Sequence, residues 1–320
     1  MQPLAGILVV DFTRLLPGAY ASRELRWLGA RVVRVEAPGG DLMRSTAPAW
    51  DRALRTGTES VVCDLKAEPA FAQALAASAD VVLEGFRPGV AERLGIGPDD
   101  VPETVVYCSI TGFGLESSHV LRVGHDLNYL GWAGALEDTA PGLPPIQVAD
   151  LAAGALGAVT RVLAALLERA RTGKGVRIVV SMTHGSHDLV AHRLGGEPIP
   201  RLLTGGLACY RIYATADGRH LTVGALEPKF FVRLCELIGR PDLAERHYDP
   251  DQEALAAELA AIFAVRTLAD WLELFDGEDV CVGPVSTLAE AAREFSAPTE
   301  PQEVALGAHT QAWRQELGLE

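Results

Sequence analysis

One short stretch of the chain carries three polar side chains that could do acid/base chemistry. It reads Gly124-His125-Asp126-Leu127-Asn128-Tyr129 and so holds an imidazole, a carboxylate and a phenol. An apolar stretch from Leu130 to Leu136 follows, which predicts a helix there. The dipole at a helix N-terminus favours a neutral histidine that can act as a base, and free backbone N–H groups there can stabilise an oxyanion. The alternative from composition alone is that Asp126 only caps the helix, beside a histidine in a turn.

A second carboxylate, Asp150, stands at the start of a long helical pattern that runs to about Arg171. Aspartate is common at helix N-termini, so Asp150 is either a cap or a catalytic acid. Gly154 and Gly157 weaken a helix locally and indicate a close approach of another backbone or a ligand. Glu227 precedes a proline much later in the chain and, taken alone, is an ordinary loop acid.

Basic residues follow two of the expected strands. Arg87 lies in Gly85-Phe86-Arg87-Pro88-Gly89-Val90, where we expect a helix to begin at Pro88, and Lys66 ends a strand in Asp64-Leu65-Lys66. Because open α/β sheets bind ligands at the carboxyl ends of their strands, two cations there suit a phosphorylated ligand. Arg87 is otherwise an ordinary surface arginine.

The histidine and cysteine residues do not have the spacing of a metal site. His184, His187 and His192 are crowded, but they do not form a zinc-type set with other residues and more simply make a polar helix face. The five cysteines are scattered and odd in number, which argues against disulfides. We therefore expect no metal and a reducing, cytoplasmic compartment.

Short apolar segments alternate with helical stretches through the first half of the chain. The strand signals are Ile7 to Val10, Val32 to Val35, Val61-Val62, Val81 to Leu83, Val105 to Tyr107 and, later, Val176 to Val180. The first helix is expected over Ala19 to Leu28. This alternation predicts an α/β, doubly wound, Rossmann-like sheet. The turn after the first strand has no GxGxxG pattern, so a dinucleotide site of the usual kind is not expected.

A change of composition near residue 195 predicts a second domain. Gly195 to Pro200 reads as a linker, and strand signals follow at Tyr210 to Ala214 and His220 to Val223. We expect a large Rossmann-like domain over residues 1–195 and a smaller α+β domain over residues 206–285. The segment from 286 to 320 could return to the large domain.

Charge and hydropathy exclude two classes of partner. The 320 residues carry a formal net charge of −14, which opposes binding to nucleic acid, and 48% are hydrophobic, enough for a large core. No basic leader precedes the first strand, and charged residues interrupt the longer apolar runs, so we expect neither a membrane span nor a targeting peptide.

The ordered motifs resemble those of the family III CoA-transferases, the CaiB/BaiF family. They are Leu4-Ala5-Gly6, Leu28 to Glu36, Asp64-Leu65-Lys66, Phe86 to Val90, Thr111 to Gly114 and Gly124 to Tyr129. The run from Gly124 and the run Gly224-Ala225-Leu226-Glu227-Pro228-Lys229-Phe230 resemble the α-methylacyl-CoA racemase branch. Asp279 to Val285 extends the likeness into the second domain.

The resemblance implies an isomerase of lipid metabolism that interconverts (R)- and (S)-2-methylacyl-CoA thioesters. By motif, His125 and Asp150 are the acid/base pair on opposite faces of the α-carbon, and Glu227 orients His125. The backbone N–H of Asp126 is our candidate for holding the enolate oxygen, and Tyr129 of the same motif is counted with the catalytic set.

The resemblance also implies a binding site and an assembly. Arg34, Lys66, Arg87 and Gly89 lie in segments that line the CoA site. Coenzyme A is part of the substrate, so no further cofactor is expected. The family architecture is an interlaced homodimer, with active sites between a large domain and the small domain of the partner.

Two alternatives stay open. A CoA-transferase would use the carboxylate of Asp126 as a nucleophile and move CoA between an acyl-CoA and a carboxylic acid. A catalytically silent binding subunit is the other, because the chain departs from the family where basic residues often stand: residues 55–60 read Arg-Thr-Gly-Thr-Glu-Ser, and position 37 is Ala37.

Overall fold

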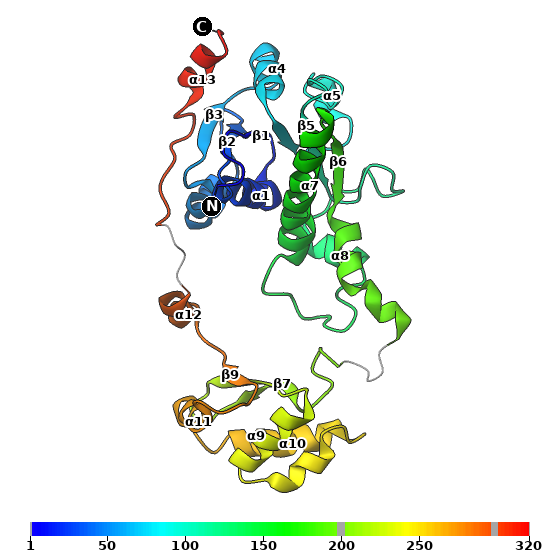
Figure 1. The fold of residues 1–320 in the computed structure, drawn as a ribbon, viewed down its shortest axis with the longest axis vertical. Coiled ribbons are helices and arrows are strands. Elements are labelled where there is room, and N and C mark those ends of the chain that lie inside the picture. Colours follow the sequence, from blue (N-terminus) through cyan, green and yellow to red (C-terminus); the bar gives the residue numbers. More distant parts are fainter. Residues whose placement is uncertain (1, 197–201, 296–299, 320) are drawn as a thin grey trace. The chain divides into compact units, whose positions relative to one another are not determined.

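The computed structural model describes residues 2–196, 202–295 and 300–319 (Figure 1). The chain folds into two compact units, each described by itself below. Unit 1 comprises Met1–His192 and Thr299–Glu320, and unit 2 comprises Arg193–Pro298. Residues 197–200 of the expected linker lie outside the described residues.

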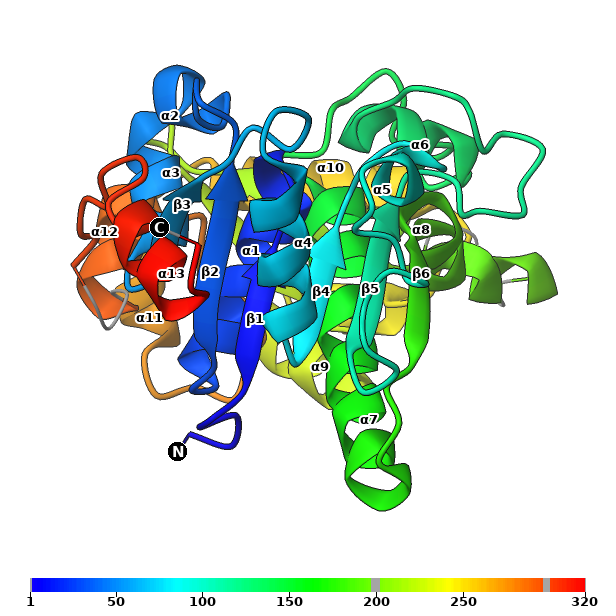
Figure 2. The same ribbon diagram turned by 90° about the horizontal axis from the view of Figure 1, so that it is seen from above.

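Unit 1 contains a six-stranded sheet in which all neighbouring strands are parallel, in the order β3-β2-β1-β4-β5-β6 (Figure 2). The strands are β1 (Leu8–Asp11), β2 (Arg31–Glu36), β3 (Glu59–Val62), β4 (Val81–Glu84), β5 (Val106–Thr111) and β6 (Arg177–Ser181). The predicted α/β class with a parallel sheet is confirmed. The chain crosses from β3 at one edge to β4, so the strand order reverses between β1 and β4, which is where such sheets bind ligands.

The helices of unit 1 connect these strands. They are α1 (Leu15–Trp27), α2 (Met43–Thr46), α3 (Pro48–Arg55), α4 (Pro69–Ser78), α5 (Val90–Arg93), α6 (Asp126–Trp132), a π-helix (Ala149–Leu156), α7 (Gly157–Thr172), α8 (Met182–Val190) and α13 (Thr310–Glu316). A 3-10 turn, Ala191–Gly195, follows α8.

Three predicted helix starts were wrong. Helix α1 begins at Leu15 rather than Ala19, because Pro17 is accommodated in its first turn. Helix α5 begins at Val90 rather than Pro88, since Gly89 takes a left-handed conformation (φ 79°) just before it. Helix α6 covers Asp126–Trp132, so it begins before the expected stretch from 130 to 136 and includes only its first three residues.

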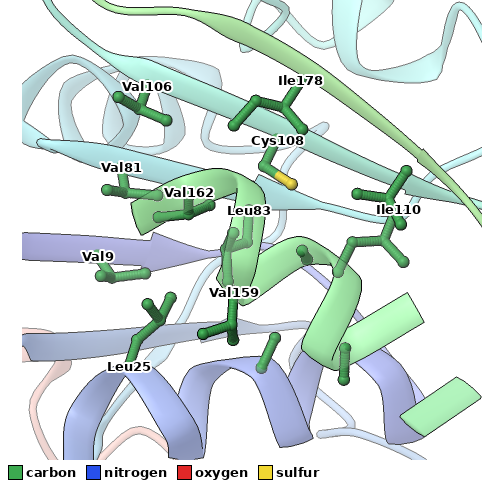
Figure 3. Close-up of a cluster of buried hydrophobic side chains, with 14 of the residues drawn as sticks. Val9, Leu25, Val81, Leu83, Val106, Cys108, Ile110, Val159, Val162 and Ile178 are labelled. Atoms are coloured by element: carbon green, nitrogen blue, oxygen red, sulfur yellow. The ribbon is translucent and has the colours of Figure 1, made fainter. Parts of the chain in front are cut away.

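The two faces of the sheet bury alternate residues of each strand, as the pleat requires. Val9 and Val81 pack against Leu25 of α1 and Val159 of α7, as Figure 3 shows. Their neighbours along the strands, Val10 and Val82, pack on the opposite face with α4 and with Trp313 of α13. Figure 2 shows α4 on one side of the sheet and α1 with α7 on the other. Because both faces are covered, each strand carries a short run of adjacent apolar residues, which made the strands predictable from the sequence.

One helical segment of the described residues, Ala149–Thr172, is long and apolar enough to cross a membrane. Its residues Val159 and Val162 lie in the core that covers the sheet (Figure 3). This packing accounts for the apolar residues on the buried side of the segment.

Glycines at the contact between the π-helix and α8 let the two helices approach closely. A Cβ on Gly154 would meet the side chain of Met182 at 3.0 Å, and a Cβ on Gly185 would meet Ala153 at 2.9 Å. The close approach predicted for Gly154 is therefore a helix–helix contact, and it fixes the segment that carries Asp150.

The C-terminal segment of unit 1 covers the edge strand β3. The backbone N–H of His309 donates to the carbonyl of Ser60 at 3.0 Å, and the Ser60 N–H donates to Nδ1 of His309 at 3.1 Å. The indole of Trp313 donates to Glu59 at 2.6 Å. These bonds satisfy an edge that would otherwise expose unpaired backbone groups.

Unit 2 has its own antiparallel sheet and core. Strands β7 (Tyr210–Ala214), β8 (His220–Gly224) and β9 (Val282–Pro284) form the order β7-β8-β9. The helical elements are α9 (Pro228–Leu237), a 3-10 helix (Pro241–Arg246), α10 (Gln252–Phe263), α11 (Leu268–Phe275) and α12 (Leu288–Glu294). Two of the three strands were predicted, whereas β9 has only three residues and gave no clear signal.

Candidate active site

His125 stands immediately before α6 and is its N-cap residue. Its backbone N–H donates to Oδ1 of Asn128 at 3.0 Å, and the Asn128 N–H donates back to the His125 carbonyl at 2.8 Å. The interpretation of Asp126 as the cap is wrong, because Asp126 is the first residue inside the helix. Both bonds involve the backbone of His125, and Asn128 contributes its side-chain oxygen to one and its backbone N–H to the other. His125 is exposed to solvent.

The side chain of Asp126 bridges to the second candidate acid. Its Oδ1 accepts a hydrogen bond from the backbone N–H of Asp150 at 2.9 Å. Asp150 lies in the first turn of the π-helix, where backbone N–H groups need outside partners. A contact between residues 24 positions apart thereby joins the start of α6 to the start of the π-helix. Single-turn π-helical segments are frequent at functional sites.

Asp150 has an unusual acidity. Burial of its side chain, followed by the negative charge of Asp126, raises the pKa of the carboxyl to about 6, and His125 opposes the shift. The ordinary value is 3.8. The structure thus brings His125, Asp126 and Asp150 within electrostatic reach of one another, and it makes Asp150 a carboxyl group that exchanges a proton near neutral pH.

Tyr129 packs against the turn that precedes His125. Its hydroxyl donates to the carbonyl of Gly124 at 2.6 Å, and its ring fills the space that a Cβ on Gly112 or Gly124 would occupy. Phe113 packs edge-on against the same ring at a centroid distance of 5.4 Å. Burial raises the pKa of the Tyr129 hydroxyl, and the charge of Asp150 adds to this. Tyr129 therefore holds the turn that precedes His125, with its proton committed to a backbone carbonyl.

A cleft of about 540 Å³ opens at the carboxyl ends of β1, β2, β3 and β4. Lys66 lines it, as do Phe12, Phe86 and Val90. Arg87 and Gly89, which we placed at the CoA site, fall between these last two in sequence but outside the lining residues. Gly89 takes a left-handed φ of 79°, which positions the first turn of α5 beside the cleft.

Arg34 itself is buried, while the next residues of its segment, Val35 and Glu36, line the cleft. Arg34 is 1% exposed, and its guanidinium lies between two carboxylates, with Nε 3.4 Å from Asp11 and Nη2 3.6 Å from Asp41. It therefore lies beneath the surface at the end of β2 and outside the lining of the cleft.

The remaining predicted residues are accounted for as follows. Glu227 is exposed in unit 2, at the N-cap of α9, and its action on His125 stays a prediction. His184 bonds Ser181 Oγ through Nδ1 at 2.7 Å, and His187 Nδ1 lies 3.0 Å from the Ala133 carbonyl. No group of three or more potential metal ligands occurs among the described residues.

The comparisons with known proteins bear on this site. The family model described as CoA-transferase family III matches residues 4–308. The chain belongs to CoA-transferase family III. Human α-methylacyl-CoA racemase is 36% identical over 310 residues, covering 90% of this chain and 78% of the relative.

A second relative and a solved structure agree with this membership. A probable fatty acyl-CoA transferase of Mycobacterium tuberculosis is 35% identical over 316 residues, covering 85% of this chain and 80% of the relative. The crystal structure of a CaiB/BaiF family protein from Brucella suis superposes with a TM-score of 0.83 at 26% identity, and the match covers 99% of both chains.

The structure shows where two of the sequence departures described above, Glu59 and Ala37, lie. Glu59 accepts hydrogen bonds from Arg31 at 2.8 Å and from Trp313. Glu59 therefore helps to attach the C-terminal segment to β3. Ala37 lines the cleft and a second cavity of about 420 Å³ beside it.

The sequence interpretation missed two cations at the cleft. Arg14 and Arg93 both line it and are exposed. Arg14 lies in the turn after β1, so the rule that ligands bind at the carboxyl ends of strands was a sufficient signal for it. Arg93 lies one helical turn into α5 and only the fold brings it to the cleft.

Proposed function

We propose that this member of the family is an acyl-CoA racemase that interconverts (R)- and (S)-2-methylacyl-CoA thioesters. The observation that carries the proposal is the environment of Asp150: burial and the neighbouring Asp126 raise the pKa of its carboxyl to about 6, beside an exposed His125. Inversion at a weakly acidic C–H bond needs a base that removes the proton and an acid that returns one. The two groups exchange these roles in the reverse reaction near neutral pH. The similarity to human α-methylacyl-CoA racemase supports the same reaction.

The proposed mechanism removes one proton from the α-carbon and returns one proton to it. Neutral His125 takes the α-proton from one face, and the electron pair of the C–H bond passes to the thioester carbonyl, giving an enolate. Protonated Asp150 then donates its proton to the opposite face. The imidazolium and carboxylate that remain are the correct pair for the reverse direction. Thioester conjugation makes the α-hydrogen acidic enough for this exchange.

The enolate oxygen needs a donor whose bond strengthens as charge develops. Asp126 is the first residue of α6, so its backbone N–H has no partner within the helix. We assign it this role. The helix dipole adds to the effect.

The proposal includes the binding of coenzyme A and the assembly. We place the CoA moiety in the cleft lined by Lys66 and Arg93, at the point where the strand order reverses. CoA enters as part of the substrate and the steps above use no added cofactor or metal. In the homodimer that we propose, Glu227 of the partner subunit orients His125.

Incubation with a 2-methylacyl-CoA in deuterated water tests the proposal. The wild-type enzyme is expected to incorporate deuterium at the α-carbon of both enantiomers and to equilibrate them. His125→Ala keeps the Asp150 carboxyl, so it should exchange the α-hydrogen of one enantiomer without inverting it, and Asp150→Asn should do the same for the other. Absence of α-exchange by the wild type over several chain lengths would remove the mechanism.

CoA transfer through Asp126 is the alternative, and the similarity to a probable fatty acyl-CoA transferase supports it. It predicts exchange of CoA between an acyl-CoA and a free acid. In the structure one oxygen of the Asp126 carboxylate accepts the Asp150 N–H, which leaves the second oxygen for attack. A catalytically silent subunit would show neither reaction, and the absence of detectable affinity for any acyl-CoA in calorimetry would favour it.

A further inference from the structure

The turn between β1 and α1 carries an unusual backbone conformation. Among the described non-glycine residues, Leu15 is the only one with a positive φ, at 61°. A leucine in the left-handed region is strained, and such residues persist only where neighbouring contacts hold them. Leu15 lies beside Arg14 at the wall of the second cavity, so the strain is stored next to a candidate ligand site.

A carboxylate holds this turn. The backbone N–H of Leu15 donates to Oδ2 of Asp41 at 3.0 Å. Asp41 is 8% exposed, and its other oxygen accepts from the Met43 N–H at 2.9 Å. On the other side of the turn, Asp11 accepts from the Thr13 N–H at 2.7 Å. Asp11 and Asp41 thus bind the two ends of the four-residue turn after β1, and we call this arrangement the clamp.

The acids are themselves fixed by buried arginines. Asp41 Oδ2 lies 3.6 Å from Nη2 of Arg34 and 3.8 Å from Nη2 of Arg55. Arg34 also faces Asp11 at 3.4 Å, so one guanidinium joins both ends of the clamp. Arg34 and Arg55 are 1% and 2% exposed. Removing one partner of such a buried ion pair strongly destabilises a protein, so the clamp is held firmly.

The clamped turn presents Arg14. This residue lines both cavities, the cleft of about 540 Å³ and its neighbour of about 420 Å³. It is the only cation among the described residues that line the smaller cavity, whose acids are Glu36 and Asp41. Arg14 is exposed and has no ion-pair partner in the described part of the chain, whereas both acids are already paired with arginines.

We propose that Arg14 binds the pyrophosphate of coenzyme A, and that Asp41 is a positioning residue that holds the strained Leu15 turn and so directs Arg14 at that group. The inference rests on the proposed acyl-CoA function. The N-terminus of α1, a helix of 13 residues, lies directly after Arg14 and contributes its positive end to the same place. A guanidinium matches a phosphate by paired hydrogen bonds.

Calorimetric titration with coenzyme A tests the assignment of Arg14. Arg14→Ala should weaken binding about tenfold, the loss of one charge-assisted contact, and Arg14→Lys should lose less. Because the pyrophosphate is the expected partner, 3′-dephospho-CoA should show the same loss in Arg14→Ala. Equal affinity of Arg14→Ala and wild type for CoA overturns the proposal, and disappearance of the loss with 3′-dephospho-CoA overturns the choice of the pyrophosphate.

A double-mutant cycle tests the role of Asp41. If Asp41 acts through Arg14, Asp41→Ala and Arg14→Ala together should weaken binding no more than Arg14→Ala alone. Asp41→Asn keeps an acceptor for the Leu15 N–H and should keep most of the affinity, as should Leu15→Gly, in which the left-handed conformation is unstrained. Losses that add in the double variant overturn the positioning role. If the wild type binds no CoA at all, the proposed function fails and not this inference alone.

Discussion

The carboxylate of Asp126 accepts a hydrogen bond from the backbone N–H of Asp150, with an Oδ1 to N distance of 2.9 Å. One side chain thereby completes the start of the π-helix and places a negative charge beside the Asp150 carboxyl. Burial is the larger cause of the raised pKa of Asp150, and this charge adds to it. Asp126 thus affects the proposed acid/base pair whether or not its own carboxylate ever touches substrate.

Asp126→Asn should separate the two candidate reactions. The amide oxygen still accepts from the Asp150 N–H, and the backbone N–H of residue 126 is unchanged. Racemisation should therefore persist within about tenfold of wild type, whereas a reaction that needs the carboxylate as nucleophile should fall by about a thousandfold or more. Assays of α-deuterium exchange and of CoA transfer on the same preparation decide the matter.

The matched variant is Asp126→Ala. It removes the acceptor as well as the charge, so the π-helix loses a cap worth about 1 kcal/mol. Racemisation should fall further than in Asp126→Asn, and thermal unfolding should occur at a lower temperature. Loss of racemisation in Asp126→Asn equal to that in Asp126→Ala would assign the carboxylate a direct chemical role.

Asp150→Asn should stabilise the fold at neutral pH while abolishing racemisation. The pKa of Asp150 is about 6 in the folded protein and 3.8 in an ordinary setting, so the protonated form favours folding. This contribution is complete below pH 3.8 and is lost as the pH rises through 6. Asparagine does not titrate, so the free energy of unfolding of the variant relative to wild type should rise by about 2–3 kcal/mol between pH 4 and pH 7. Urea denaturation at both pH values measures it, and an unchanged difference would contradict the raised pKa.

The sheet of unit 1 could be predicted because its strands are buried on both faces. Val9 and Val10 pack on opposite sides, and so do Val81 and Val82, which leaves short apolar runs in the sequence. Helix starts were less predictable. They depend on local backbone details such as the left-handed Gly89. Helix α6 also depends on the packing of Tyr129 against Gly112 and Gly124, which the apolar pattern does not show.

The candidate site could be predicted in part. Motif order selected His125, Asp126 and Asp150, but the bond between the last two joins residues whose distance in space no local pattern encodes. The acidity of Asp150 likewise follows from burial. Arg34 illustrates the opposite case: the family resemblance put its segment at the CoA site, and only packing reveals that Asp11 and Asp41 enclose its guanidinium.

Glu36→Gln should destabilise unit 1 at neutral pH. The Glu36 side chain is 3% exposed. Burial works to raise the pKa of its carboxyl, but hydrogen bonds from Arg44 and the charge of Arg55 outweigh it and lower the value to about 2. Removing the charge takes from Arg44 its carboxylate partner and leaves Arg55 paired with Asp51 and Asp41 alone, at a cost of about 3 kcal/mol in the free energy of unfolding.

The pH dependence gives this prediction a second readout. Because the pKa of Glu36 is lowered on folding, its contribution is present above pH 4.5 and is lost as the pH falls from there through about 2. The cost of Glu36→Gln should shrink correspondingly in acid. The control is Glu316→Gln, which breaks an exposed ion pair with Arg31 and should cost less than about 1 kcal/mol. Equal costs for the two variants would show that burial of the Glu36 cluster contributes nothing.

Complementation between two inactive variants tests the proposed homodimer and the role of Glu227. Subunits carrying His125→Ala and subunits carrying Glu227→Gln are co-expressed with different affinity tags, and dimers holding both tags are purified. If Glu227 of the partner subunit serves His125, one of the two sites in such a dimer contains both native residues, so racemisation should return to about half of the wild-type rate. The control pairs His125→Ala with Asp150→Asn. His125 and Asp150 belong to the same unit of one chain, so every site of that dimer lacks one of them and should stay inactive in racemisation. Equal activity in the two mixed dimers, or none in the first, would contradict the shared site.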